Sequence, residues 1–195
     1  MWLGMTLMKN ILKKSSPLLL ALPLLSNAAL ADETYIGLNY DLVHYSELFV
    51  EKDSISLNGV SLSLGHMFNK RWGIETKFGA GFNTKETEFD SDLIRFRVDH
   101  YASVLAVTKF SFTNNFSGAI KWGLTRSEVT QTKKVGIDWQ DYRTEERSGL
   151  IGASVLWAMD YKFTDASAVD FEVGILSNRA VRNLYGIRLG VKTNF

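Results

Sequence analysis

The sequence predicts an all-β fold, an eight-stranded antiparallel up-and-down transmembrane β-barrel. Three observations predict it. Eight segments alternate apolar and polar residues with a period of two, which is the pattern of a strand with two different faces. Their connections alternate between short turns and long polar stretches, and aromatic residues collect at the segment ends. Together these features are typical of barrels that cross an outer membrane.

The first 31 residues stand apart from this pattern. A basic stretch opens them, with Lys9, Lys13 and Lys14. The apolar run Pro17–Leu25 that follows is too short to span a bilayer as a helix, which takes about 20 residues. Ala29–Ala31 is a small-x-small cleavage pattern. We therefore expect residues 1–31 to be a signal peptide that is removed, and residues 32–195 to form one outer-membrane β-barrel domain. Two methionines suit the start of translation, Met1 and Met8.

The composition of the mature chain excludes several classes of protein. Loss of three lysines and no acidic residue changes the formal charge from +1 to −2, so no strong basic field remains for nucleic acid. There is no cysteine, which excludes a fold held by disulfides. No mature segment has about 20 consecutive apolar residues, which excludes a transmembrane helix. A near-neutral mean hydropathy remains compatible with a membrane barrel, because only alternate residues of each strand face lipid.

The alternation sets the expected strand boundaries. The strands are Thr34–Leu42, Ile55–Phe68, Trp72–Phe82, Ile94–Phe112, Phe116–Ser127, Ser148–Tyr161, Ala168–Leu176 and Leu184–Phe195. Asn83–Asp92 and Glu128–Arg147 are expected to be long polar loops, and Ser177–Arg182 a short one. Short turns follow the second, fourth and sixth strands. An even strand number places both termini on the periplasmic side and lets the last strand pair with the first.

One face of the predicted sheet carries apolar residues and the other carries charges. Six acids and six bases share the polar face: Asp41, Glu75, Lys77, Arg95, Arg97, Asp99, Lys121, Asp160, Asp170, Glu172, Arg188 and Lys192. An eight-stranded barrel is just wide enough for side chains to fill it, so we expect these charges to pair inside it. The alternative is a narrow path for ions or small solutes.

Aromatic residues favour a membrane barrel over a soluble, lipocalin-like barrel, which would turn the apolar face inward. The expected periplasmic girdle is Phe68, Trp72, Phe110, Phe112, Phe116, Tyr161, Phe163 and Phe195. The expected outer girdle is Tyr40, Phe82, Phe96 and Tyr185. Such belts lie at the two membrane–water interfaces.

The mature chain resembles the small eight-stranded outer-membrane barrels, the OmpX and Opa-like group and the barrel domain of OmpA. Its last strand is similar to their assembly signal, a polar-x-Gly-x-x-aromatic-x-aromatic pattern, through Arg188, Gly190 and Phe195. Thr193 stands where the pattern has its first aromatic residue. The resemblance implies insertion by the barrel assembly machinery in the bacterial outer membrane. It does not imply one function, because function depends on sites carried by a fold.

Few residues point to chemistry. We expect no catalytic residue, metal or cofactor. The open alternative is a lipid A-modifying enzyme that uses His44 and Ser46, since lipid A deacylases are similar barrels with a His-x-Ser pair, and a histidine can activate a serine.

The expected function is a structural or surface-interaction role, adhesin-like, through extracellular loops 1 and 3. Trp139, Tyr142 and Arg143 in the third loop are the candidate binding residues, because aromatic residues and arginine are enriched at protein interfaces. The expected partners are outer-membrane lipid and lipopolysaccharide, the assembly machinery during biogenesis, and an extracellular ligand. We expect a monomer.

Overall fold

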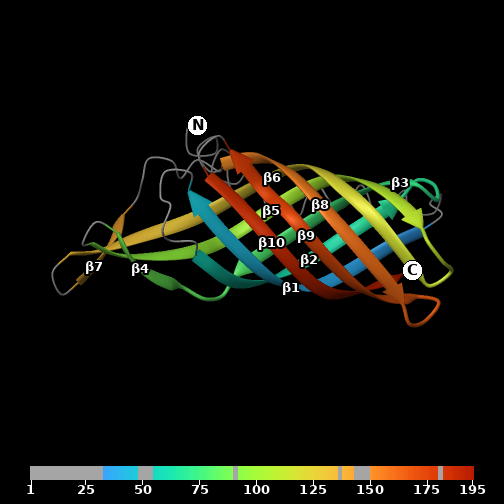
Figure 1. Ribbon diagram of the computed structural model, residues 1–195, viewed down its shortest axis with the longest axis horizontal. Coiled ribbons are helices and arrows are strands. Elements are labelled where there is room, and N and C mark those ends of the chain that lie inside the picture. The colour runs from blue at the N-terminus through green and yellow to red at the C-terminus, as the bar shows by residue number, and fades with distance from the viewer. Residues whose placement is uncertain (1–32, 48–54, 90–91, 136–137, 143–149, 180–181) are drawn as a thin grey trace, which may run out of the picture. The chain divides into compact units, whose positions relative to one another are not determined.

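The computed structural model describes residues 33–47, 55–89, 92–135, 138–142, 150–179 and 182–195 (Figure 1). The strands are β1 (Glu33–Glu47), β2 (Ile55–Met67), β3 (Trp72–Gly81), β4 (Lys85–Phe89), β5 (Asp92–Ser111), β6 (Phe116–Val135), β7 (Asp138–Tyr142), β8 (Leu150–Lys162), β9 (Ser167–Arg179) and β10 (Arg182–Asn194). The described residues contain no helix long and apolar enough to cross a membrane.

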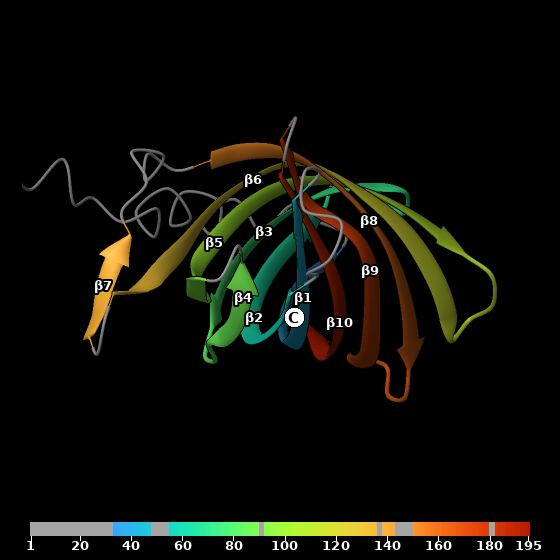
Figure 2. The ribbon, with the colours of Figure 1, turned by 60° about the vertical axis from the view of Figure 1, so that its left-hand side comes forward.

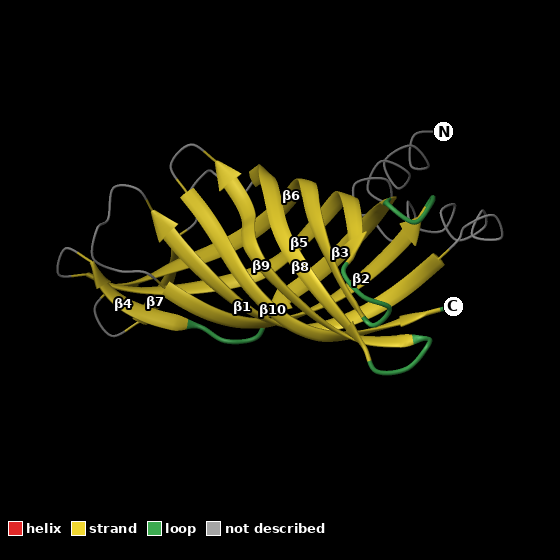
Figure 3. Ribbon diagram, turned by 45° about the vertical axis from the view of Figure 1, so that its right-hand side comes forward, coloured by secondary structure: helices red, strands yellow, loops and turns green. Residues whose placement is uncertain are grey.

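Eight of these strands close into an antiparallel barrel, which confirms the predicted fold class (Figure 3). Neighbours in the sheet follow the order β3-β2-β1-β10-β9-β8-β6, and the β5 strand pairs with both β3 and β6 to complete the ring. The first and last strands pair from Tyr35 opposite Asn194 to Glu47 opposite Arg182. The Phe195 amide extends the pairing by donating to the Thr34 carbonyl at 2.9 Å. Closure leaves no open edge within the bilayer, where backbone groups have no water to bond.

Three tight turns at one end of the barrel are built alike. Each begins with an aromatic residue whose amide bonds back to the residue that opens the next strand, as Phe68 does to the Trp72 carbonyl at 2.9 Å. The following side chain accepts backbone amides of the turn: Asn69 accepts from Arg71 and Trp72, both at 2.9 Å. Thr113 and Thr164 act in the same way in the other two turns. Short polar side chains thus replace the missing ladder bonds.

Side chains alternate between lipid and lumen along each barrel strand, as the period-two pattern predicts. On β8, Ile151, Trp157 and Tyr161 are 61%, 58% and 57% exposed, while Ser154 and Asp160 between them are buried. The exposed apolar surface continues around the barrel, for example at Leu38, Leu62, Val104, Leu124 and Leu189. A monomeric protein in water rarely exposes so much contiguous apolar surface, whereas lipid requires it.

The barrel continues beyond the membrane as a four-stranded sheet. The β5 and β6 strands are 20 residues long each, about twice the 9–11 residues that cross a bilayer. The short strands β4 and β7 pair with their far ends. We call this part, made of residues 85–98 and 129–142 of the described chain, the projecting sheet (Figures 1 and 2).

Three expected loops are therefore wrong, and β1 also runs past the expected end at Leu42 to Glu47. Asn83–Asp92 and Glu128–Arg147 were expected to be loops, but they contain β4, the end of β6 and β7. Most of Ser177–Arg182 likewise belongs to β9 and β10. The apolar alternation ends where lipid ends, whereas the backbone ladder continues into water with polar side chains.

A β-bulge in β5 separates the two halves of that strand. Val98 lies opposite Val129 and His100 lies opposite Glu128, so Asp99 is an extra residue without a partner. Above the bulge the inward residues have even numbers, and below it they have odd numbers. An extra residue inverts the facing of everything beyond it.

Because of the bulge, the predicted facing of four residues is wrong. Phe96 is buried inside and does not join the outer aromatic girdle. Arg95, Arg97 and Asp99 lie on the outward side and do not join the interior charges. Arg95 instead bonds Glu86 on β4 at 2.6 Å, and Arg97 bonds Asp99 at 2.6 Å.

Candidate functional site: the lumen and the outer rim

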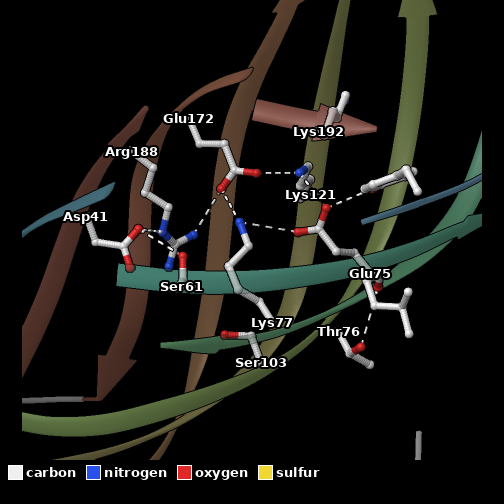
Figure 4. Close-up of polar contacts among 12 residues, drawn as sticks. Asp41, Ser61, Glu75, Thr76, Lys77, Ser103, Lys121, Glu172, Arg188 and Lys192 are labelled. Carbon is white, nitrogen blue, oxygen red and sulfur yellow. Dashed lines mark hydrogen bonds and ion pairs between the residues drawn. The ribbon is translucent and has the colours of Figure 1, made fainter. Parts of the chain in front are cut away.

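The middle of the lumen holds a six-charge ionic cluster. Its members come from five strands and are all buried: Asp41, Glu75, Lys77, Lys121, Glu172 and Arg188 (Figure 4). Three acids balance three bases. Each charge has at least one opposite partner within 4 Å, which offsets the cost of removing it from water.

Glu172 is the centre of this ionic cluster. Its two carboxylate oxygens accept from Lys77 and Lys121, and Arg188 adds a third contact at 3.0 Å. Lys121 also bonds Glu75 at 2.7 Å, and Lys77 lies 3.3 Å from the other oxygen of Glu75. Strands β3, β6, β9 and β10 are thereby joined across the lumen (Figure 4).

Two tyrosines complete the ionic cluster. Tyr101 donates to Asp41 and accepts a bond of 3.2 Å from Arg188, whose guanidinium carbon lies 5.3 Å from the centre of its ring. Tyr35 donates to Glu75 at 2.7 Å. Each ring lies over a glycine: a Cβ at Gly79 would come within 2.1 Å of Tyr101. The glycines of the polar face thus leave room for lumen side chains.

A second group of charges lies towards the periplasmic turns. Lys192 pairs with Asp160 at 2.5 Å and lies 5.0 Å from the centre of the Tyr35 ring. Asp170 faces Asp160 across the β8–β9 pair and is only 4% exposed. One of its carboxylate oxygens has no hydrogen-bond partner. The nine buried charges that were predicted for the interior thus comprise five acids and four bases, with Asp170 in excess.

A group of buried apolar side chains, which we call the apolar layer, shares the lumen with the ionic cluster and extends towards the projecting sheet. It consists of Val43, Leu57, Phe96, Val98, Tyr101, Leu105, Leu156, Leu176 and Leu184, with Val129 packed against it. Apart from Phe96 and Val98, which the bulge turns inward, these residues occupy the lumen-facing parity that the sequence interpretation treated as polar throughout. Apolar residues on the otherwise polar parity, such as Leu105 and Leu156, were the available signal for this layer.

A chain of hydroxyl groups lines the lumen wall beside the ionic cluster and the apolar layer. Ser103, Thr125 and Ser154 lie on neighbouring strands, with oxygens 2.7 and 2.6 Å apart. Ser154 donates to the Leu176 carbonyl at 2.6 Å. The β9 strand has an irregular register here, with Leu176 and Ser177 both buried. The hydroxyl therefore satisfies a carbonyl that the ladder leaves unpaired.

The residues of the alternative enzyme site lie at the outer rim. His44 is on the lipid-facing parity of β1, its Nδ1 atom is 3.2 Å from the Ser56 hydroxyl, and its ring lies 6.4 Å from that of Tyr185. The Ser46 backbone is in β1, opposite Asn183, and its side chain lies outside the described ones. The described contact of His44 is therefore with Ser56 on the neighbouring strand.

The remaining predicted site residues are spread over both ends. Arg188 belongs to the ionic cluster, and a Cβ at Gly190 would come within 2.1 Å of the Asn39 side chain. Phe195 is exposed beside β1. Trp139 and Tyr142 lie in β7 with side chains outside the described ones, and Arg143 is outside the described residues altogether. Among the described residues, no group of three or more His, Cys, Asp or Glu could hold a metal ion.

Comparison with known proteins decides the family. A family model described as the outer membrane protein beta-barrel domain matches residues 18–195. The chain belongs to this family. Its members' location places the protein in the bacterial outer membrane, with the exposed apolar face of the barrel against lipid. A search of curated proteins found no match.

Solved structures show the same fold. Ail of Yersinia pestis, solved in complex with the heparin analogue sucrose octasulfate, is 17% identical, with 84% of this chain and 98% of that chain covered and a TM-score of 0.56. Neisserial surface protein A is 14% identical over 83% and 97% of the two chains, with a TM-score of 0.55. OprG of Pseudomonas aeruginosa is 12% identical over 85% and 97%, with a TM-score of 0.54. At these identities the likeness is one of fold.

Proposed function

We propose that this outer-membrane barrel serves surface interaction, in an adhesin-like role, through its first and third extracellular connections. The projecting sheet supports the part of this proposal that concerns the third connection, which contains β7; its other edge strand, β4, belongs to the second connection, and residues 48–54 of the first lie outside the described residues. The β4 and β7 strands are the two ends of the projecting sheet, and each pairs with one strand only among the described residues. A free strand edge offers backbone donors and acceptors to an extended segment of another protein. Trp139 and Tyr142 in β7 would add side-chain contacts.

The filled lumen favours this role over a channel. The ionic cluster joins opposite walls of the barrel, and the apolar layer fills more of the lumen towards the projecting sheet. An ion that entered would have to displace buried ion pairs and then cross an apolar layer, both at a large cost in free energy.

The lipid-modifying alternative has less support. His44 contacts Ser56 at 3.2 Å through Nδ1, and no described carboxylate contacts the imidazole. A nucleophile of this type needs a base that is itself oriented by a third group. We infer that the described contact between His44 and Ser56 is structural. Replacing the serine of the alternative site, Ser46→Ala, should leave the mass spectrum of lipid A unchanged.

The adhesin-like role can be tested by shortening the projecting sheet. Replacing residues 133–142 with a two-residue Asn-Gly turn removes β7 and leaves the barrel strands intact. Cells that display the full protein should adhere to heparin-coated surfaces, and cells with the shortened protein should not. Heparin is included because Ail, a barrel of the same fold, was solved with a heparin analogue. Equal adhesion by both would contradict the proposal, and the substitution Asp165→Asn in a periplasmic turn is the control.

A further inference from the structure

A belt of charged side chains lies on the outward face of β5 and β6, directly above the apolar surface. We call it the outer belt; it consists of Arg97, Asp99, His100, Arg126 and Glu128. Its three basic side chains are more than half exposed. The outer belt points away from the lumen, so it has no part in the interior ion pairs.

The height of Arg126 above the periplasmic girdle follows from strand geometry. Phe116 opens β6 and stacks on Phe112, with ring centres 5.3 Å apart, in that girdle. Arg126 is on the same strand face, ten positions later. At about 3.4 Å per residue and a tilt of about 40°, ten residues rise about 26 Å. The apolar band of such barrels is about 25 Å tall, so Arg126 lies at its outer boundary.

The neighbours of Arg126 are those of a lipid-facing residue. Ala102 on β5 and Ile151 on β8 lie opposite it in the sheet, and the exposed Leu124 precedes it on the same face. An arginine in this position places its aliphatic stem along apolar surface and its guanidinium among lipid headgroups. At such an interface the charge itself costs only about 0–1 kcal/mol.

The contacts within the outer belt leave the guanidinium of Arg126 able to donate hydrogen bonds to another group. The Nη2 atom of Arg126 is 3.4 Å from Oε1 of Glu128, and the Nε2 atom of His100 is 3.5 Å from Oε2 of the same carboxylate. Both distances are long for a charge-assisted bond. Arg97 differs, because it holds Asp99 at 2.6 and 2.5 Å while Thr130 donates to the same carboxylate. Arg97 is therefore fixed, and Arg126 has donors to offer.

We propose that Arg126, with His100 beside it, binds the phosphate group of a glycolipid headgroup in the outer leaflet. A planar guanidinium suits two parallel bonds to phosphate oxygens. The position favours a lipid over free phosphate: the acyl chains of a lipid would lie against Leu124 and Ile151 when its phosphate reaches Arg126. Glu128 opposes the phosphate charge and limits the affinity.

The test compares variants of the full protein, purified from outer membranes in detergent, for binding of lipid A bisphosphate and of dephosphorylated lipid A. Arg126→Gln should weaken binding of the bisphosphate about tenfold, and Glu128→Gln should strengthen it. Arg71→Gln, which removes an exposed arginine at the periplasmic end, should change nothing. Arg126→Lys should retain part of the affinity.

Three outcomes would overturn the proposal. One is equal binding of lipid A bisphosphate by Arg126→Gln and the natural protein. Another is equal binding of phosphorylated and dephosphorylated lipid A. The third is displacement of the lipid by low-millimolar inorganic phosphate, which would assign an ordinary anion site. The faster gel migration of the unboiled barrel checks that each variant is folded.

Discussion

Lys77 and Glu172, 95 residues apart in the sequence, form an ion pair that joins β3 to β9 across the lumen. Both side chains are buried, and Glu172 also holds Lys121 and Arg188. The pair therefore links strands that share no backbone hydrogen bond, and Glu172 gathers contacts with three buried bases on one carboxylate.

Glu172→Gln should destabilise the folded barrel by about 3–5 kcal/mol, because it leaves buried cations without their shared partner. Urea unfolding in detergent micelles measures the change. Glu86→Gln is the matched control, since it removes the exposed partner of Arg95 and should cost less than about 1 kcal/mol. A loss of unfolding free energy in Glu172→Gln as small as that in Glu86→Gln would show that the ionic cluster contributes little.

Asp170→Asn should leave the barrel as stable as before or raise its stability on the order of 1 kcal/mol, because this buried acid lacks a partner for one oxygen and faces Asp160. Asp160→Asn should instead destabilise, since it removes the ion pair with Lys192. The same urea titration at neutral pH compares the two. A loss for Asp170→Asn as large as that for Asp160→Asn would contradict the excess-charge assignment.

Single-cysteine labelling can test the β5 bulge, because the natural chain contains no cysteine. Arg97→Cys should react readily with a water-soluble maleimide, and Phe96→Cys should react slowly because its side chain is buried. Deleting Asp99 removes the extra residue and should reverse this order. Unchanged labelling after the deletion would show that the bulge does not set the facing.

Deleting Phe195 should reduce insertion into the outer membrane more than it reduces the stability of barrel already folded. The side chain is 70% exposed, and its backbone adds only one bond to the β1–β10 pairing. Insertion yield in cells and urea unfolding of the purified variant provide the two measurements. Equal losses would count against a role of Phe195 as an assembly signal.

The alternation in the sequence was enough to predict the barrel and its lipid-facing side, because lipid imposes one rule on every second residue. Lys77, Lys121 and Glu172 could be assigned inward by parity alone. Their partners could not be assigned, since pairing depends on strand tilt and register across the lumen.

The errors have three separate causes. The prediction continued one odd–even alternation of facing across Asp99, because nothing in the sequence there marks an extra residue. The predicted strands ended at Ser127 and before Lys85, because the apolar alternation of the sequence stops at the edge of the lipid. The backbone hydrogen bonds between the strands continue beyond it. The apolar layer was missed because Leu105, Leu156 and Leu184 lie on the parity that carries the charges, where buried apolar side chains were not expected.

The bulge at Asp99 also sets a rule for how this protein can change over evolutionary time. Above it, Phe96 and Val98 must continue to face the lumen to complete the apolar layer. Insertions or deletions of two residues in β5 between Val98 and Tyr101 would preserve that facing. A change of one residue there would expose Phe96 to the medium. Length variation in the outer part of β5 should therefore occur in even steps, and an odd step should be accompanied by loss of the bulge.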